Sequence, residues 1–175
     1  VYATAFNKGL LPGSYVSDGR LSRKDYPDMP RDWSPRNSDG KFGGLIPAHR
    51  ALVRSRNTPA VRVGVYAGLD RIRTMAGDAG FLGQIPSHYA SFLGSFEATP
   101  LEVATAYTTF PNNGERPRPY LIEEIRDREG KLLYRSGTIT VAVYSPGATW
   151  VTTQILQGVT QPGGTAGNTR QLGFK

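Results

Sequence analysis

Ser55 and Asn57 are the residues of this sequence best suited to chemistry, because they stand one residue apart beside a proline. A serine hydroxyl is a poor nucleophile until a neighbouring base takes its proton, so the chemistry would depend on such a base. By itself the pattern Ser-x-Asn is weak, since such tripeptides are frequent. The alternative interpretation is a serine at the end of a helix, followed by an asparagine in a left-handed turn.

Other kinds of chemistry find little support in the residues. His49 and His88 are the two histidines, and they lie far apart without metal-ligand spacing, so we expect no metal site. The sequence has no cysteine, which removes thiol nucleophiles, disulfides and zinc thiolate sites. It has no glycine-rich nucleotide motif and no G-x-S-x-G elbow, although counting alone leaves a Ser-His-Asp triad open. We therefore expect no cofactor.

The composition is that of one folded domain. The chain has 175 residues, of which 38% are hydrophobic and 20% charged, and it contains no long charge block. A net charge of +7 raises nucleic acid as a partner, but the basic residues are spread along the chain among the acidic ones. We therefore expect no nucleic acid partner. No apolar run reaches the roughly eighteen residues of a membrane span.

The first half of the sequence predicts a long connection and then a helix. Residues 10–44 hold many prolines and glycines with little periodicity, which indicates one irregular segment. A helix is predicted over 45–55, with Ala48, Leu52 and Ser55 on one side. Ser55 is therefore expected to face the core. The asparagine and proline that follow should end this helix.

Two short helices are predicted next, over 59–66 and 69–79. The buried side of the second should comprise Leu69, Ile72, Ala76 and Ala79. A further helix should begin at Thr99, because Glu102 stands three residues later and the two can form a capping box. The buried stripe expected for this helix comprises Leu101, Ala104, Tyr107 and Phe110.

The last part of the sequence predicts a hairpin, a strand and a helix. Residues 120–135 place Gly130 between two apolar runs, as in a hairpin, and residues 139–143 alternate as in a short strand. Ser145 should cap the last helix. The buried face expected for that helix comprises Ala148, Val151, Ile155 and Val159. The whole reads as an α+β fold, mostly helical with a small hairpin.

Five segments, in the same order, resemble the transpeptidase domain of class A penicillin-binding proteins. The segments are Val1–Phe6 with Gly9–Pro12, Trp33–Asn37 with Asp39–Gly44, Ala51–Val61, Leu93–Ala104 with Ala106 and Tyr107, and Gly164–Ala166. The most specific is Ala51–Val61, which is similar to the family's A-L-x-x-S-x-N-x-P-A-V stretch. Matches of this number and order are hard to produce by accident, so the chain is identified as a member of that family.

The resemblance implies a serine D,D-transpeptidase that cross-links peptidoglycan stem peptides through an acyl-enzyme and is acylated by β-lactam antibiotics. Ser55 would pass protons between the family's lysine and the departing D-Ala, and Asn57 would hold the substrate amide. Thr165 is a further candidate for substrate binding, with a plain turn as the equal alternative. The resemblance also implies an extracytoplasmic enzyme with a parent anchored in the membrane.

Two elements of the family pattern are missing from the chain. The S-x-x-K nucleophile should lie just before Val1, and the K-T-G strand just after Lys175, so these residues alone should be catalytically silent. We expect a piece of a longer domain whose central sheet lies largely elsewhere. Arg56 has no role that the sequence supports, and Ile46-Pro47 stands where the family usually has a threonine cap.

The resemblance divides the chain into segments of one partial domain. These are the end of the nucleophile helix (1–9), the irregular loop (10–44), the helical body (45–119), the hairpin and strand (120–144), and the last helix with the lead-in to K-T-G (145–175). Two other functions stay open at this point. One is a non-catalytic β-lactam sensor or scaffold of the same fold, and the other is a basic module that binds nucleic acid or an anionic membrane.

Overall fold

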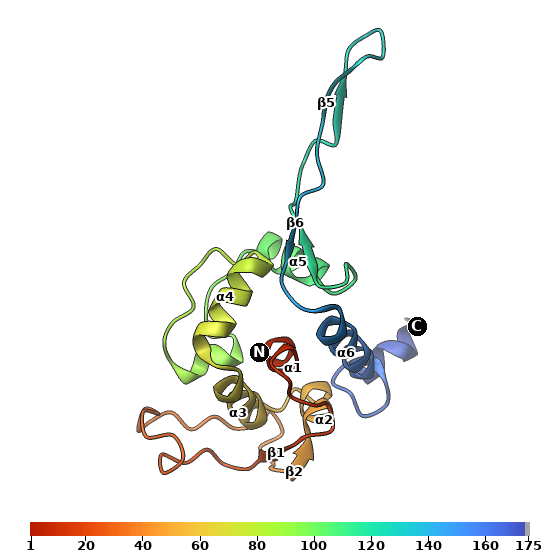
Figure 1. The fold of residues 1–175 in the computed structure, drawn as a ribbon. Helices are drawn as coiled ribbons and strands as arrows, with labels where there is room; N and C mark the ends of the chain where they lie inside the picture. Colours follow the sequence, from red (N-terminus) through yellow and green to blue (C-terminus); the bar gives the residue numbers. More distant parts are fainter. Residues whose placement is uncertain (174–175) are drawn as a thin grey trace.

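The structure is organised around one buried helix. The computed structural model describes residues 1–173. Helix α1 (Tyr2–Asn7) lies at the centre of the body and contacts α3 (Asn57–Ala67), α4 (Leu69–Ala79) and α6 (Pro146–Gln157), which surround it in Figure 1. Five consecutive residues of α1 are buried, so the helix is covered on all sides rather than along one stripe.

The remaining helical elements complete the body. They are α2 (Ala48–Val53), α5 (Pro100–Thr108) and the 3₁₀ helices η1 (Tyr89–Leu93), η2 (Gly158–Thr160) and η3 (Gly167–Leu172). The main hydrophobic core draws on α1, α2, α3, α4, η1 and α6, and a smaller core cluster joins α4 to α5. The predicted α+β class with a mostly helical body is confirmed.

Strands occur only as antiparallel pairs in the described part of the chain. The pairs are β1 (Tyr15–Asp18) with β2 (Gly44–Pro47), β3 (Glu115–Pro117) with β6 (Thr140–Ala142), and β4 (Glu124–Arg126) with β5 (Leu132–Arg135). The β4–β5 hairpin projects far from the body in Figure 1, and we call residues 118–139 the arm. The hairpin predicted over 120–135 is confirmed, with Gly130 in the left-handed region at φ 83°.

The segment predicted to be irregular, residues 10–44, contains the whole of β1. Its partner β2 pairs Tyr15 with Pro47 and Asp18 with Gly44, so most of the segment is a loop closed by this ladder. The prediction was wrong here because the pairing joins residues far apart in the sequence. Four-residue strands with a proline at one end carry little local signal.

The helix predicted over 45–55 was wrong at both ends. Its first residues form β2, and Pro47 is extended (φ −61°, ψ 144°), so α2 begins only at Ala48. At the other end, Ser55 lies outside the helix and is exposed, whereas it was expected to face the core. The next helix begins at Asn57, two residues before the predicted start. Asn57 therefore opens α3 rather than ending α2.

Helix α5 has the predicted capping box but not the predicted buried stripe. The Thr99 N–H donates to the Glu102 carboxylate at 2.6 Å, and the Glu102 N–H donates to the Thr99 hydroxyl at 3.2 Å. Three of the four stripe residues are exposed, with Leu101 at 64% and Tyr107 at 60%, while the buried residues are Thr105 and Ala106. In the described chain this apolar face has no neighbouring element to cover it.

Helices α4 and α6 agree more closely with the sequence. Helix α4 has the predicted bounds, and Ile72 and Ala79 are buried on the expected side. Helix α6 is capped by Ser145, whose hydroxyl accepts from the Ala148 N–H at 3.3 Å. The expected face of α6 was too long by one position, because Val159 lies in η2.

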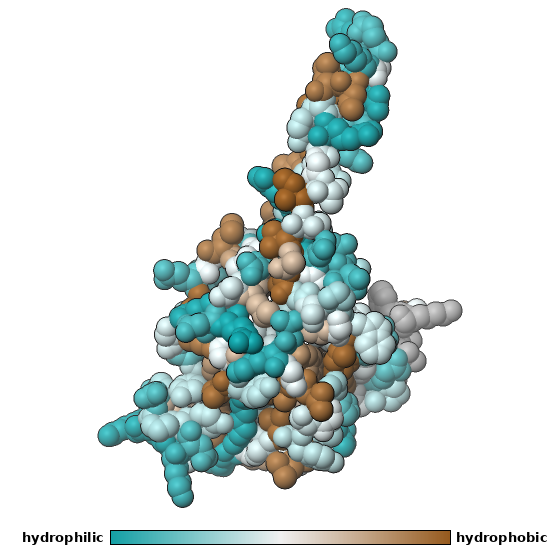
Figure 2. Space-filling model, viewed as in Figure 1, coloured by the Kyte–Doolittle hydropathy of each residue, from teal (hydrophilic) through white to brown (hydrophobic). Residues whose placement is uncertain are grey.

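The arm carries apolar side chains on its surface. Figure 2 shows hydrophobic residues along it between charged ones. The exposed members are Tyr120, Leu121, Ile122, Ile125, Leu132, Leu133, Tyr134 and Ile139. Glu124 forms an ion pair with Arg126 on its own strand and one with Arg135 on the opposite strand, and their solvent exposure makes both weak. No helix among the described residues has the length and apolar character needed to cross a membrane.

Candidate active site

Ser55 lies in a strained turn at the end of α2. Its φ of 49° places it in the left-handed region, which is uncommon for a residue other than glycine. The Ser55 N–H donates to the Leu52 carbonyl and the Arg56 N–H to the Ala51 carbonyl, each at 3.0 Å. This pair of bonds is a Schellman motif, whose left-handed position is usually glycine. The turn ends α2 and leaves the serine exposed.

Asn57 is held by the loop that precedes β2. Its backbone N–H donates to Asn37 Oδ1 at 2.8 Å, and its side-chain Nδ2 donates to the Arg36 carbonyl at 2.7 Å. The second bond uses one of the two amide hydrogens, and an asparagine side chain offers a further hydrogen and a carbonyl oxygen. The side chain can therefore be oriented by the loop and still bind another amide.

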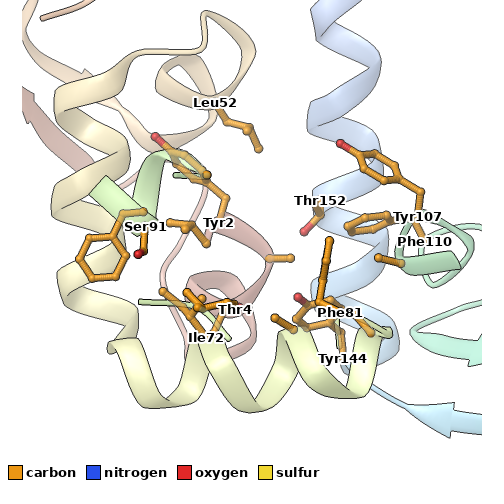
Figure 3. A pocket seen from close by; sticks show the side chains of 18 of the residues that line it. Tyr2, Thr4, Leu52, Ile72, Phe81, Ser91, Tyr107, Phe110, Tyr144 and Thr152 are labelled. Carbon is orange, nitrogen blue, oxygen red and sulfur yellow. The ribbon is translucent and has the colours of Figure 1, made fainter. Parts of the chain in front are cut away.

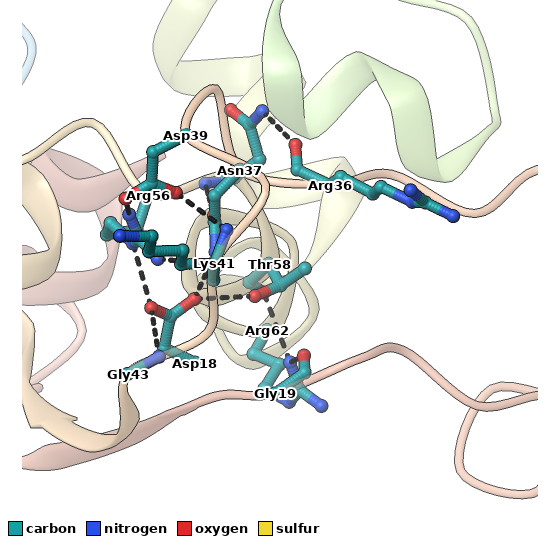
Figure 4. A network of polar contacts seen from close by, with 11 residues as sticks. Asp18, Gly19, Arg36, Asn37, Asp39, Lys41, Gly43, Arg56, Thr58 and Arg62 are labelled. Carbon is teal, nitrogen blue, oxygen red and sulfur yellow. Dashed lines mark hydrogen bonds and ion pairs between the residues drawn. The ribbon is translucent and has the colours of Figure 1, made fainter.

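Arg56, between the two site residues, reaches into a polar network at their back (Figure 4). Its Nε donates to Asp18 Oδ2 and its Nη1 to Asp39 Oδ2, both at 2.8 Å, while Nη2 donates to the Lys41 carbonyl at 2.6 Å. Burial lowers the pKa of Arg56, but its bonds to Asp39 and Asp18 outweigh this and the net shift is upward. The sequence alone predicts no role for Arg56. In the structure its guanidinium ties the backbone between Ser55 and Asn57 to Asp18 and Asp39.

Asp18 is the buried centre of that network, at 1% exposure. One carboxylate oxygen accepts from Asn37 Nδ2 at 2.7 Å and from the Thr58 hydroxyl at 2.9 Å. The other accepts from Arg56 and from the Gly43 N–H, the latter at 3.0 Å. A buried carboxylate with four donors is well compensated for its loss of water.

Sequence reasoning missed three members of this network in different ways. Asn37 and Asp39 lay inside one of the segments that resemble the family, but no role was drawn from them. Asp18 had no local signal, because a lone aspartate beside a glycine usually marks an exposed turn. The pKa of Asp39 is lowered, first by the Lys41 N–H that donates to it and then by the bond from Arg56.

Ser55 and Asn57 share a cavity with the start of the central helix. The cavity has a volume of about 180 Å³, and its lining includes Tyr2, Phe92 and both site residues. Tyr2 is buried, and its hydroxyl has no hydrogen-bond partner among the described residues. Burial, with a smaller contribution from the charge of Asp18, raises the pKa of the Tyr2 phenol. The structure thus brings the two predicted site residues to the N-terminal end of α1.

Tyr2 also borders a second, apolar cavity of about 350 Å³ (Figure 3). The side chains around this cavity come from α1, α2, α4, α5, α6 and η1 and from the connections between them, and Ile72, Phe81, Tyr107 and Phe110 are among them. Polar groups are few, so the cavity suits packing against an apolar segment more than it suits chemistry. The candidate site is therefore the smaller cavity at Ser55.

Thr165 lies apart from the other two predicted site residues. It is exposed in a turn after η2 and lines a separate polar cavity of about 260 Å³ with Asp39, Arg54 and Arg56. Only Arg56 borders both this cavity and the one at Ser55. No cluster of three or more potential metal ligands occurs in the residues that the structure describes.

Comparison with known proteins identifies the family of this chain. A family model described as the penicillin-binding protein transpeptidase domain matches residues 1–175. The chain belongs to the penicillin-binding protein transpeptidase family. Among curated relatives, penicillin-binding protein 1A of Rickettsia conorii is 36% identical over 135 residues, which cover 77% of this chain and 17% of that protein. The same protein of Neisseria gonorrhoeae is 34% identical over 133 residues, covering 75% and 17%.

Solved structures agree with this membership. The crystal structure of penicillin-binding protein 1A from Haemophilus influenzae has a TM-score of 0.69 and 32% identity, covering 81% of this chain and 21% of that one. The imipenem acyl-enzyme complex of penicillin-binding protein A from Mycobacterium tuberculosis has a TM-score of 0.77 over 90% of this chain and 41% of that one. Its 21% identity shows the fold alone. The chain spans about a fifth or less of the proteins named 1A.

Proposed function

We propose that this chain is part of a serine D,D-transpeptidase that cross-links peptidoglycan stem peptides and is acylated by β-lactams. One observation carries the proposal: Ser55 and Asn57, matched by the family's Ser-x-Asn, line one cavity together with the N-terminal end of the central helix α1. That helix is the one on which the family places its nucleophile. Acyl-enzyme complexes of the M. tuberculosis relative with imipenem, ceftriaxone and penicillin G support the same chemistry.

In this proposal Ser55 carries protons and Asn57 positions the substrate. The exposed Ser55 hydroxyl would relay a proton between the lysine of S-x-x-K and the departing D-Ala. Asn57, already oriented by its bond to the Arg36 carbonyl, would hold the amide of the stem peptide in the attack geometry. Thr165, from its neighbouring cavity, would contact a more distant part of the substrate.

The nucleophile and the strand that binds the substrate carboxylate would come from the parent protein. We place the S-x-x-K serine before Val1, and K-T-G after Lys175. Loss of a serine nucleophile costs on the order of a millionfold in a comparable enzyme, so the 175 residues alone would be inactive. The parent would work outside the cytoplasmic membrane, anchored by a segment elsewhere, because peptidoglycan is assembled there.

The test uses the full-length parent and a fluorescent penicillin. Ser55→Ala and Asn57→Ala should each slow acylation about a hundredfold or more, with the melting temperature nearly unchanged. Ser34→Ala is the matched control, since Ser34 is exposed on the nearby loop and lines neither the cavity at Ser55 nor the one at Thr165. Acylation without any cross-linking of stem peptides would instead indicate a β-lactam sensor.

A further inference from the structure

The backbone of the Ser55–Asn57 tripeptide is held by a polar network centred on Asp18, which does not line the cavity at Ser55. Ser55 has a left-handed backbone, Arg56 is extended (φ −75°, ψ 123°), and Asn57 begins α3. The backbone conformation is therefore different at each of these three residues. Sparsely populated backbone conformations persist only where the surrounding structure over-determines them.

The guanidinium of Arg56 supplies one part of that constraint. It bonds at once to Asp18, to Asp39 and to the carbonyl of Lys41, which lie on β1 and on the loop before β2. The Arg56 side chain is 11% exposed and Asp18 1%, so solvent screens this ion pair little. A planar guanidinium can serve three acceptors in fixed directions, whereas an ammonium is a point charge.

Asn37 supplies a second part, because it links Asp18 to the backbone of the site. Its Nδ2 donates to Asp18 Oδ1 at 2.7 Å and to the Lys41 carbonyl at 2.8 Å, which fixes the side chain. Its Oδ1 then accepts from the Asn57 N–H. Asp18 is thus connected to Asn57 through Asn37, and directly to Arg56.

The Thr58 hydroxyl closes the network on the far side of the tripeptide, since it donates to the same Asp18 oxygen as Asn37. One carboxylate therefore contacts the residues on both sides of Asn57: the side chain of Arg56 before it, and the hydroxyl of Thr58 in the first turn of α3 after it. A shift of Asp18 would rotate the start of α3 relative to the end of α2. Ser55 and Asn57 lie on either side of Arg56, in the connection between the end of α2 and the start of α3.

We propose that Asp18, Asn37 and Arg56 are positioning residues that fix Ser55 and Asn57 relative to each other for acylation. The proposal rests on the transpeptidase function proposed above. Asp18 and Asn37 act through the tripeptide and lie outside the cavity at Ser55, while Arg56 borders that cavity and acts through its bonds to Asp18 and Asp39. Displacement of a catalytic group by about 1 Å can cost on the order of a hundredfold in rate, so a looser network lowers the acylation rate even in a folded protein.

Arg56→Lys in the full-length parent is the main variant, because it keeps the positive charge and removes the planar guanidinium. Arg62→Lys is the matched control: Arg62 on α3 donates to the Gly19 and Arg20 carbonyls, each at 3.0 Å, and bonds neither Ser55 nor Asn57. Both variants lose bonds that tie α3 to the chain after β1 or before β2. Both should therefore lower the melting temperature to a similar degree.

Acylation by a labelled penicillin separates positioning from stability. We expect Arg56→Lys to slow acylation about tenfold or more, and Arg62→Lys to stay within about twofold of the wild type. Equal acylation rates in the two lysine variants would overturn the proposal. Ser55→Ala belongs in the same experiment. If Ser55→Ala is also acylated at the wild-type rate, the transpeptidase assignment fails. If Ser55→Ala is not acylated while Arg56→Lys is acylated at the wild-type rate, only the positioning role fails.

A second variant covers the case in which Arg56→Lys does not fold. Asp39 is 49% exposed, so Asp39→Asn removes one charged partner of the guanidinium without emptying a buried site. We expect a folded protein whose acylation is about threefold or more slower, because the bond from Arg56 to residue 39 loses the charge of its acceptor and weakens. An Asp39→Asn protein with wild-type acylation would also overturn the proposal.

Discussion

The side-chain oxygen of Asn37 accepts a hydrogen bond from the backbone N–H of Asn57 at 2.8 Å, which joins the loop before β2 to the first turn of α3. The N–H groups in the first turn of a helix have no partner within the helix, so this bond satisfies one of them. The end that it caps is the one that carries the site asparagine. The loop is therefore part of the framework of the candidate site.

Asn37→Asp should destabilise the domain and make its stability depend on pH. The introduced carboxyl could no longer donate to Asp18, and two buried carboxylates would meet where a 2.7 Å hydrogen bond now stands. We expect a loss on the order of 3 kcal/mol at neutral pH in urea unfolding.

The direction of that pH dependence follows from the raised pKa of the introduced carboxyl beside a like charge. Below its unfolded value, about 3.9, the carboxyl is protonated in both states and the penalty disappears. The penalty should grow as pH rises from there through the raised folded pKa. A stability deficit that stays constant from pH 3 to pH 7 would contradict this account of the network.

Ser55→Gly should stabilise the domain while it removes activity. Glycine takes the left-handed position of a Schellman motif without strain, whereas a side chain there costs roughly 1–2 kcal/mol. Ser55→Ala keeps the strain and is the matched control. We expect the glycine variant to be about 1 kcal/mol more stable than the alanine variant in urea unfolding, with both slow in acylation. A glycine variant less stable than the alanine variant would argue against the strained turn.

The strained turn also shows what the sequence could and could not predict. Pattern reasoning placed Ser55 on the helix face, because a serine three residues after Leu52 fits helical spacing. The pairing of β1 with β2 delays the start of α2, and the network around Asp18 holds Arg56 just after the turn that ends it; both involve residues far away in the sequence. The local pattern does not contain that information. The roles proposed for Ser55 and Asn57 come from the resemblance of Ala51–Val61, which does not predict their geometry.

Elements defined by local interactions were predicted best. The capping box of Thr99 and Glu102 and the arm turn at Gly130 depend on residues within one turn of each other. The exposed face of α5 was missed for a different reason: Leu101 and Tyr107 are apolar and regularly spaced, but the described chain leaves more than half of each residue exposed, 64% and 60%. Amphipathic spacing predicts a face that can be covered, and its burial depends on a partner element.

Gly64→Ala should destabilise the domain, because a methyl group there would overlap with the ring of Phe92. Overpacking of this kind costs about 1–3 kcal/mol, and Phe92 lines the cavity beside Ser55. Gly77→Ala on α4 is the control, since Gly77 is exposed with open space around it, and alanine should stabilise that helix by about 0.5–1 kcal/mol. Urea unfolding should show a lower free energy of unfolding for Gly64→Ala and a higher one for Gly77→Ala than for the wild type. Equal effects would mean that Phe92 moves aside freely.

Glu102→Gln should reduce the acid sensitivity of the domain. The N–H groups of Thr99 and Leu82 donate to the Glu102 carboxylate and lower its pKa. A carboxyl with a lowered folded pKa stabilises above its unfolded pKa, about 4.3, and this contribution is lost as pH falls through the folded value.

The glutamine variant should therefore melt at a lower temperature than wild type at pH 7, and the difference should shrink toward pH 3. Glu97→Gln is the control, since Glu97 is exposed and lies outside the capping box. Melting curves at several pH values measure both variants. If the melting temperatures of Glu102→Gln and wild type differ as much at pH 3 as at pH 7, the charged carboxylate does not have this role.

Acylation of the full-length parent by a labelled penicillin, followed in time, is the most direct test of the roles of Ser55 and Asn57. We expect Ser55→Ala and Asn57→Ala each to lower the second-order rate constant about a hundredfold or more, while Ser34→Ala stays within about twofold of the wild type. Wild-type rate constants in both site variants, with the proteins folded, would contradict the assignment of this cavity as the active site.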